Sequence, residues 1–339
     1  MRTELPEGLP LVCPRCRRRD DSGWHMHTLA VVETFALDGD RVREGVLACV
    51  SCAARYPIID GVPLVMTELA GYLHSELPAL LEGALTPSAE ALIVESLDGK
   101  EPFAQLIEHL SIYLDAHWGD HLAPPPADGD GGFAMAAVVD KLRARAASPV
   151  AYAVEIGCGA GRAAAELARG ARRVIALDSS IGVLRRTRRL LAGEAVGFAR
   201  RTSSRHAALA TVSAGELSSP TIDLVCADAH DPPLVPGHYD RVVALNVLDS
   251  VRAPSTVLAV LDRLCAPGGE LILSCPFSGP SGFDGPDPDR QLLARLRDGK
   301  QLDASYHIED EDELTWTLRR DNRCKVNYRT LYVRARKAG

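Results

Sequence analysis

An apolar run near the middle of the chain ends directly in a glycine loop, and a helix-like stretch follows at once. The run is VAYAVEI, from Val150 to Ile156, the loop is GCGAG, and the stretch after it is RAAAELARG. Glycines let the backbone turn sharply and approach a ligand, and the start of the helix directs free N–H groups toward the same point. This order predicts a doubly wound α/β domain that binds a nucleotide-type ligand.

The loop differs from the dinucleotide fingerprint, which has a third glycine or alanine where this chain has Arg162. Its spacing instead resembles the first motif of the class I S-adenosylmethionine (SAM) methyltransferases. The resemblance implies that SAM contacts a group of residues in and beside the loop: Glu155, Gly157, Cys158, Gly159, Gly161 and Arg162.

Four more strand-like runs follow in the order of the same fold. VIALDSS contains Asp178, 21 residues after Gly157, where a carboxylate can accept both ribose hydroxyls of a nucleoside. TIDLVCADAHD contains Asp228, whose counterpart in the SAM family often meets the adenine amino group. HYDRVVALNVLDSV and LCAPGGELILSCPF supply the fourth and fifth strands. Ser179 and Ala229, which follow the two acids, complete the cofactor site that the resemblance implies.

The resemblance therefore implies a SAM-dependent methyltransferase domain over residues 133–339, an α/β domain with the Rossmann-like seven-stranded sheet of that family. One alternative is a Rossmann-like fold that does not bind SAM. Another is a non-catalytic protein that uses the SAM-like fold only as an interaction surface. The intact glycine loop and the acids at both strand ends disfavour this second alternative.

Four of the nine cysteines form two Cys-x-x-Cys pairs near the start of the chain. Cys13 and Cys16 are separated by 32 residues from Cys49 and Cys52. Two such turns suit one tetrahedral zinc ion, and Asp38-Gly39 between them is typical of a hairpin. The sequence therefore predicts a zinc ribbon, with four cysteines packed in a core as the alternative.

The run after the second pair, ARYPIIDGVPLVM, resembles the Trm112-like zinc-ribbon family. In that family the module is often a partner or appendage of methyltransferases. The resemblance covers about residues 9–67, and we expect a zinc-ribbon domain over residues 1–67. A module of this size gains folding free energy from its metal, so we expect a structural Zn²⁺.

Leucines at helical spacing over residues 68–122 predict two or three helices. PPPADGDGG, over residues 124–132, interrupts regular structure and predicts a boundary. We therefore expect a helical linker or lid over residues 68–132. Tyr113, His117 and Trp118 either line a pocket in this lid or pack in the core.

Charge and hydropathy limit where the protein acts. No apolar run is long enough to cross a bilayer, and the first ten residues lack a signal-peptide pattern, so we expect a cytoplasmic protein without a membrane partner. The net charge of −7 disfavours a general nucleic-acid surface. The oligomeric state does not follow from the sequence.

Two segments contain the candidate acceptor residues. ALNVLDSVRAP, after the fourth strand, resembles the Asn-x-x-Asp stretch of DREV-type protein-histidine methyltransferases and of the ovothiol-type methyltransferase domain, and both methylate an imidazole nitrogen. LTWTLRR, before the final strand, resembles the ovothiol-type pattern, although SGPSGFDGPDPDR after Phe277 departs from it. The resemblance implies a small-molecule or peptide acceptor. The catalytic residues would be Asn246 and Asp249, and Asn246 would also lie beside the cofactor. The residues that would bind the substrate are Trp316, Arg319, Arg320, Tyr113 and His117.

Purely structural roles are the alternative for these residues. Asn246 is also typical of a turn at a strand end, and Trp316 of a core. No general base follows from the sequence, because four histidines are candidates by residue type only: His206, His230, His238 and His307.

An RNA base methyltransferase is the rival enzyme hypothesis, because one ribosomal-RNA guanine methyltransferase type also begins with a four-ligand zinc module. The negative net charge of the chain, and the presence of only five lysines among its 38 basic residues, disfavour an RNA substrate. Residues 185–189 more simply form a solvated helix face. The phosphate track would consist of Arg185, Arg186, Arg188, Arg189, Arg200, Arg201 and Arg205.

Overall fold

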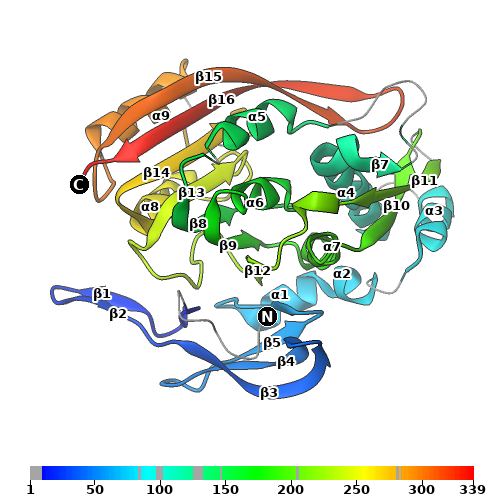
Figure 1. The fold of residues 1–339 in the computed structure, drawn as a ribbon, viewed down its shortest axis with the longest axis horizontal. Helices are drawn as coiled ribbons and strands as arrows, with labels where there is room; N and C mark the ends of the chain where they lie inside the picture. The colour runs from blue at the N-terminus through cyan, green and yellow to red at the C-terminus, as the bar shows by residue number, and fades with distance from the viewer. Residues whose placement is uncertain are drawn as a thin grey trace.

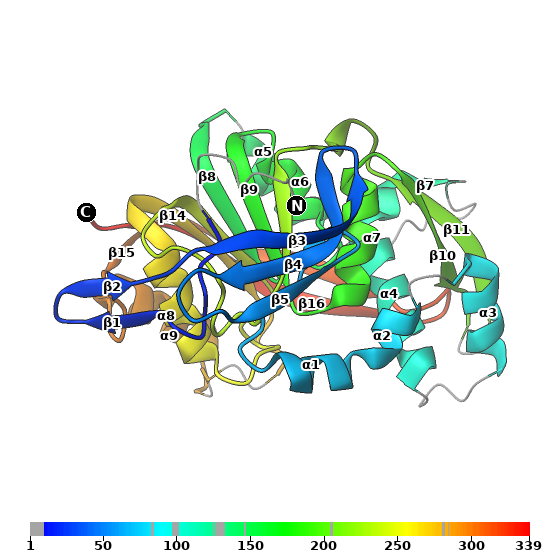
Figure 2. The same ribbon diagram turned by 90° about the horizontal axis from the view of Figure 1, so that it is seen from below.

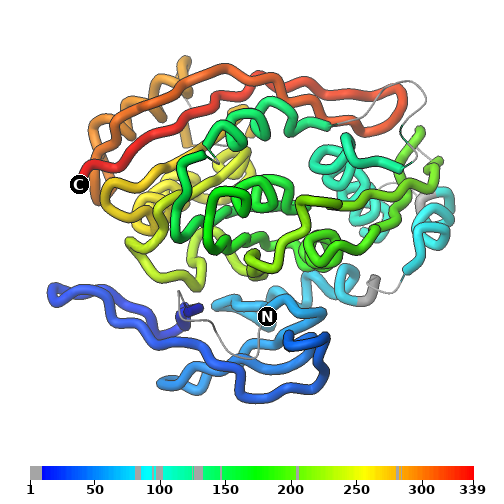
Figure 3. Tube along the Cα trace, viewed as in Figure 1, coloured from blue at the N-terminus to red at the C-terminus, as the bar shows by residue number. Residues whose placement is uncertain are grey.

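The chain is seen here as a computed structural model, in which a large α/β body lies beside a smaller β module (Figures 1 and 3). The β module consists of the first strands of the chain, and the body contains the central sheet with its helices. The structure describes residues 10–82, 85–96, 102–123, 125, 133–145, 147–203, 206–279, 282–283 and 285–339.

The central sheet has seven strands in the order β12-β9-β8-β13-β14-β16-β15. The first five are parallel, and β16 runs antiparallel to both β14 and β15. The prediction of an α/β fold with a seven-stranded, mostly parallel sheet is therefore confirmed. The strands are β8 (Val150–Ile156), β9 (Ala171–Asp178), β12 (Ile222–Cys226), β13 (Tyr239–Leu245), β14 (Cys265–Cys275), β15 (Tyr306–Arg319) and β16 (Lys325–Lys337).

Alternate side chains of the parallel strands point into two separate apolar layers, which is why these strands are apolar nearly throughout. Ala153 and Val243 pack with α5 (Ala136–Arg145), α6 (Arg162–Leu167) and α7 (Ile181–Leu191). Val154 and Val242, one residue away, pack on the other face with α8 (Pro254–Leu264) and α9 (Pro288–Asp298).

The β module covers the part of this second face that helices leave open. Residues 227–238, between β12 and β13, form no helix, and Leu29 and Leu47 of the module share the apolar layer of Ile175 instead. Figure 2 shows the module lying across the sheet at this place. Its strands are β3 (Leu29–Asp38), β4 (Arg41–Cys49), β5 (Arg55–Ile59) and β6 (Val62–Pro63), preceded by the hairpin β1 (Arg18–Asp20) and β2 (Gly23–His25).

The predicted hairpin forms between β3 and β4, where Asp38 pairs with Arg41 and Gly39 has φ of 59°. Hydrogen bonds then fix the module to the body. The Val65 N–H donates to the Cys226 carbonyl (2.9 Å), beside a bridge that pairs Leu64 with Cys226. The module is thus attached to the last residue of β12.

Four α-helices, rather than the two or three predicted, connect the module to the body: α1 (Leu69–Ser75), α2 (Leu77–Glu82), α3 (Pro87–Ser96) and α4 (Pro102–Trp118). A short turn (Gly119–His121) and β7 (Leu122–Ala123) follow. β7 pairs with β11 (Ala207–Ser213), which pairs with β10 (Ala195–Arg201), in a small sheet that the sequence interpretation missed. Of the expected boundary segment 124–132, only Pro125 lies within the described residues.

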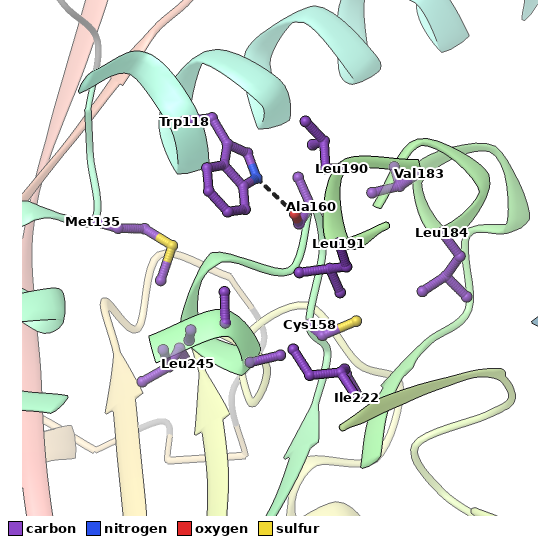
Figure 4. Packing of buried hydrophobic residues seen from close by; sticks show 14 of the residues in the cluster. Trp118, Met135, Cys158, Ala160, Val183, Leu184, Leu190, Leu191, Ile222 and Leu245 are labelled. Atoms are coloured by element: carbon purple, nitrogen blue, oxygen red, sulfur yellow. Dashed lines mark hydrogen bonds between the residues drawn. The ribbon is translucent and has the colours of Figure 1, made fainter. Parts of the chain in front are cut away.

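Helix α4 ends against the glycine loop. The ring of Trp118 is fully buried, and its Nε1–H donates to the Ala160 carbonyl at 2.7 Å (Figure 4). The packing alternative for Trp118 is therefore correct. Within the described part of the chain, no helix combines the length and apolarity needed to span a membrane.

Candidate cofactor and acceptor site

The glycine loop turns between β8 and α6 with three left-handed residues. Gly157, Gly159 and Gly161 have φ of 74°, 49° and 79°, a region that side chains disfavour. A Cβ atom on Gly157 would lie 2.4 Å from Val247, and one on Gly161 would lie 2.4 Å from Thr187. Both glycines are therefore required by the backbone and by the space around them.

Two helices hold the carbonyl groups of the loop. The Thr187 hydroxyl on α7 donates to the Gly159 carbonyl (3.1 Å), as Trp118 on α4 does to that of Ala160. The loop is thus fixed in shape before any ligand binds.

A cavity of about 490 Å³ lies beside this loop, at the carboxyl ends of β8, β9 and β13. A second cavity, of about 400 Å³, lies near the beginnings of β8, β9 and β12, and none of the predicted cofactor or acceptor residues lines it. The first cavity brings together most of them: Tyr113, His117, Glu155, Gly157, Gly159, Asp178, Ser179, Asp228, Ala229, Asn246, Asp249 and Trp316.

Arg162, expected at the cofactor, points away from the cavity. Its guanidinium is fully buried, donates to both carboxylate oxygens of Asp120 (2.7 and 2.9 Å) and lies between the rings of Trp118 and Phe133. A buried charge needs such a partner, and the nearest carboxylates lie behind the loop. The placement of Arg162 in the cofactor site was wrong, and its position supports α4 instead.

Cys158 and Gly161 also lie outside the cavity. The Cys158 side chain is buried in the core (Figure 4), and burial raises the pKa of its thiol well above the ordinary value. It therefore fills space rather than contacting a ligand. Gly161 faces Thr187.

The two arginines assigned to the acceptor pocket are engaged elsewhere. Arg319 is buried, donates to the Arg201 carbonyl (2.9 Å) and forms an ion pair with Asp115 (3.6 Å). Arg320 pairs with Glu108 (3.0 Å) at the surface. Strand side chains alternate, so Trp316 and Leu318 face the cavity while Arg319 does not.

Asp178 holds the loop and retains capacity for a ligand. One carboxylate oxygen accepts the Gly159 N–H (2.9 Å), and the other accepts the Ser180 N–H (2.8 Å). A carboxylate has about four lone-pair sites, so these hydrogen bonds do not exhaust its capacity to accept from a ligand. Burial raises the pKa of Asp178, against the opposing effect of these hydrogen bonds.

Glu155 has an orphaned acceptor in the cavity wall. Its side chain is buried, and its Oε2 has no hydrogen-bond partner within the described structure. Burial, with the nearby charge of Asp178, raises the pKa of Glu155 well above the ordinary value. A ligand that brings a donor to this oxygen would satisfy it.

Asp228 is fixed by His230. The backbone N–H and the Nδ1 of His230 lie 2.9 and 2.6 Å from the Asp228 Oδ1, and the His230 Nε2 accepts the Ala253 N–H (3.2 Å). Although burial alone raises it, these hydrogen bonds lower the pKa of Asp228. Both ring nitrogens of His230 are thus engaged, and neither His206, His238 nor His307 lines the cavity.

Two histidines that do line the cavity come from α4. Burial, together with the charge of Arg162, lowers the pKa of His117 to about 3, so this ring is neutral. Its Nδ1 lies 3.5 Å from the Arg162 N–H, which leaves the proton on Nε2, toward Gly159. The ring centroids of His109 and Tyr113 lie 4.3 Å apart, with the two ring planes tilted by 37°, and burial lowers the pKa of His109 as well.

Asn246 combines the two roles that its sequence position suggested. It turns the chain after β13 with φ of 55°, and it also lines the cavity. Its backbone N–H donates to the Ser274 hydroxyl (3.1 Å), and that hydroxyl donates to the Asn246 Oδ1 (2.8 Å). Ser274 thus occupies one of the two lone pairs of this oxygen, and the amide NH₂ is a second group that Asn246 offers to a ligand.

Asp249 uses one carboxylate oxygen to hold the loop after β14. Its Oδ2 accepts the backbone N–H (3.2 Å) and the hydroxyl (2.8 Å) of Ser278, so Oδ1 is the oxygen available to a ligand. Aromatic rings form the adjoining walls: Tyr113 from α4, and Trp316 and Tyr328 from the β15–β16 hairpin.

Sequence interpretation missed Tyr328, Leu318, His109 and Ser278. Tyr328 could have been found from the hairpin, because it is the register partner of Trp316. His109 lies one helical turn before Tyr113, so helical spacing pointed to it. Ser278 had no sequence signal of its own.

The four paired cysteines come together in the β module. Their sulfur atoms all lie within 4.8 Å of one another, with 3.7 Å between Cys13 and Cys52 and 3.6 Å between Cys16 and Cys49. Tetrahedral zinc with Zn–S bonds of about 2.3 Å places sulfur atoms about 3.8 Å apart. The donor set and its spacing therefore fit one zinc ion.

The arginines of the supposed phosphate track are distributed among separate ion pairs. Arg186 and Arg201 are buried, so the interpretation of residues 185–189 as a solvated face holds only in part. Arg205 lies outside the described residues. The pairs are Arg185–Asp60, Arg186–Glu90, Arg188–Asp38, Arg189–Glu194, Arg200–Asp115 and Arg201–Glu108.

Residues 154–273, which include the glycine loop and the acids at the strand ends, match the family model described as a methyltransferase domain. This segment is a methyltransferase domain. The chain is also 28% identical over 158 residues to the ubiquinone biosynthesis O-methyltransferase of Xanthomonas campestris pv. campestris. That alignment covers 47% of this chain and 56% of the relative, so the chain spans about half the length of the curated relatives it matches.

Two solved structures are similar to the methyltransferase domain and its surroundings. The N-methyltransferase NodS from Bradyrhizobium japonicum, in complex with S-adenosyl-L-homocysteine, is 14% identical with a TM-score of 0.41, over 69% of this chain and 100% of that one. A SAM-dependent methyltransferase from Aquifex aeolicus is 13% identical with a TM-score of 0.38, over 58% and 88%.

Proposed function

We propose that the protein binds SAM in the 490 Å³ cavity and transfers its methyl group to a nitrogen of an imidazole or a similar heteroaromatic ring, in a small molecule or peptide. One observation supports this most strongly. The glycine loop and Asp178 line the same cavity as Asn246 and Asp249, so a nucleoside and an acceptor ring can lie side by side.

The residues present fit SAM. The free lone pairs of Asp178 suit the ribose hydroxyls, and Asp228 suits the adenine amino group. The orphaned oxygen of Glu155 offers an acceptor for a further donor of the cofactor. SAM supplies a methyl group on a positively charged sulfur, which departs as a neutral thioether.

Positioning is the main task of the protein in such a transfer, because the attacking atom must lie close to the methyl group and in line with it. A neutral imidazole has one N–H and one nitrogen with a free lone pair. The Asp249 Oδ1 accepts the N–H and so directs the bare nitrogen toward the methyl group. Asn246, whose Oδ1 accepts the Ser274 hydroxyl, lines the same cavity and limits how the ring can turn.

No base is needed before the attack, since the attacking nitrogen has no proton. The methylated ring becomes a cation that the Asp249 carboxylate stabilises, and it then loses its N–H proton to water. This agrees with the state of the cavity histidines, because His117 is held neutral with Nδ1 against a backbone N–H.

We also propose that Cys13, Cys16, Cys49 and Cys52 hold a structural Zn²⁺ in a zinc ribbon of the Trm112-like type. The spacing of the sulfur atoms supports this. None of the four cysteines lines the 490 Å³ cavity, which supports a structural role for the metal. The metal would stabilise the module that covers one face of the sheet.

The deciding assay is methyl transfer from labelled SAM to histidine, thiol-histidine, histidine-containing peptides and total RNA. We expect label in an imidazole compound, and loss of turnover on the order of 10²-fold in Asn246→Ala and Asp249→Ala, with SAM affinity little changed. Asp298→Asn, an exposed carboxylate at the end of α9, is the control. Label in RNA alone, or equal rates in all variants, would contradict the proposal.

A further inference from the structure

We infer that the acceptor has a positively charged group beside the ring that is methylated, and that the cavity rejects anionic acceptors. This inference rests on the proposed function. It narrows the substrate class from heteroaromatic rings in general to rings that carry a positively charged substituent. Three features of the cavity support it: the sign of its charges, the position of Asp249, and its aromatic walls.

The charged groups of the cavity wall have one sign. Among the described residues that line it there is no lysine or arginine. Three aspartates line it, Asp178, Asp228 and Asp249, together with Glu155, whose pKa burial raises well above the ordinary value. Arg252, which lies 3.7 Å from Asp228 with its side chain 88% exposed, is not among the lining residues. A phosphate or carboxylate on the acceptor would therefore lose its hydration without gaining a cationic side chain of the described wall as a partner.

Asp249 stands apart from the carboxylates that suit the cofactor. Asp178 and Asp228 follow β9 and β12, whereas Asp249 follows β13 and is tied to the loop after β14 through Ser278. Tyr113 lines the same cavity as both groups, and burial first, and then the charges of Asp178 and Asp249, raise its pKa. A negative charge thus remains on the acceptor side after the cofactor has bound.

Aromatic rings surround this charge. Tyr113 approaches from α4, while Trp316 and Tyr328 face the cavity as register partners on the β15–β16 hairpin. The faces of such rings attract an ammonium group, and the attraction grows as the group leaves water. Rings and a carboxylate together form a wall suited to an organic cation, and the same rings can stack on the neutral ring that is methylated.

The test compares three compounds that share one imidazole ring: histamine, with an ammonium group; 4-methylimidazole, with no charged substituent; and imidazole-4-acetate, with a carboxylate. Methyl transfer from labelled SAM gives kcat/KM for each. We expect histamine to exceed imidazole-4-acetate by about tenfold or more at low salt, with 4-methylimidazole between them. The ratio should fall in Asp249→Asn, which removes the charge and keeps the shape, and should be unchanged in Asp298→Asn.

Because the ratio compares two acceptors on one variant, a general loss of turnover in Asp249→Asn does not affect it. Binding of the same compounds to the protein loaded with S-adenosyl-L-homocysteine, followed by ligand-observed NMR, tests charge selection without any turnover. Imidazole methylation with equal or higher kcat/KM for the anion would overturn this inference and leave the proposed function standing. Failure of all three compounds to bind would overturn the inference, and failure of SAM to bind would overturn the proposed function.

Discussion

The Tyr72 hydroxyl donates a hydrogen bond to the Ser179 carbonyl at 2.8 Å and lies 3.0 Å from the Cys226 sulfur. Tyr72 belongs to α1, directly after the β module, whereas Ser179 follows the cofactor carboxylate Asp178. One side chain therefore connects the start of the helical region to the ends of β9 and β12. The module and its first helix thus support the cofactor end of the cavity from outside.

Tyr72→Phe should weaken SAM binding by about two- to tenfold, the effect of one net hydrogen bond, without changing the fold. The reason is that the backbone at Ser179 loses its support beside Asp178. Calorimetric titration measures the affinity. Tyr152→Phe removes a hydroxyl near the beginning of β8 and serves as the control. Equal losses in both variants would show that the contact with Ser179 has no special role.

Asp178→Ala should weaken SAM binding by about 1.5–3 kcal/mol, because a carboxylate contact to hydroxyls is a charge-assisted hydrogen bond. The substitution also removes the acceptor of the Gly159 N–H, so Asp178→Asn is needed beside it. Asparagine keeps one acceptor and should lose less affinity than alanine. Unchanged affinity in the alanine variant would mean that β9 does not end at the ribose.

The parallel strands were predictable from the sequence because each is a short apolar run, and three of them, β8, β9 and β12, end at or just before the glycine loop or an acid. The glycine loop, Asp178 and Asp228 were found for that reason, and all line the cavity or its edge. The small sheet was missed because β7, the partner of β11, is only two residues long and lies in a distant part of the chain. The local sequence of a two-residue strand contains no pattern that predicts its pairing partner.

Side-chain direction was the least predictable property of the site. Arg162 and Arg319 lie close in the sequence to residues that line the cavity, yet both turn toward carboxylates contributed by distant segments, the exposed Asp120 and the buried Asp115. The free energy of pairing a buried charge decides their direction, and the partner cannot be identified from sequence spacing. The occupation of the Asn246 oxygen by Ser274, 28 residues later, was hidden for the same reason.

Glu155→Gln should stabilise the protein without ligand at neutral pH and weaken SAM binding. Burial raises the pKa of Glu155 above its unfolded value, so the folded state binds the proton more tightly, and stability falls as pH rises from the unfolded toward the folded pKa. Glutamine removes this penalty and can still accept the Ala164 N–H. We expect Tm to rise by roughly 2–4 °C at pH 7.5, with no difference near pH 4. A lower Tm at pH 7.5 would contradict the burial argument.

Zinc removal should loosen the cofactor site as well as the β module. Arg17, directly after the first cysteine pair, donates to the carbonyls of Pro232 (2.7 Å) and Leu234 (3.1 Å), in the loop that begins at Asp228. Metal analysis should find one zinc per chain, and Cys49→Ser should lose it, with a lower Tm and weaker SAM binding.

Arg17→Gln keeps all four sulfur ligands and removes only the guanidinium contacts to that loop, so it separates the two effects. We expect this variant to retain zinc and to lose roughly threefold in SAM affinity, the scale of one net hydrogen bond. Arg15→Gln, next to the metal loop but without a contact to residues 228–234 in the described structure, is its matched control. If Cys49→Ser keeps its zinc, other residues are the ligands. If this variant loses zinc and activity while its Tm and SAM affinity stay unchanged, the metal acts in catalysis rather than in stabilising the fold.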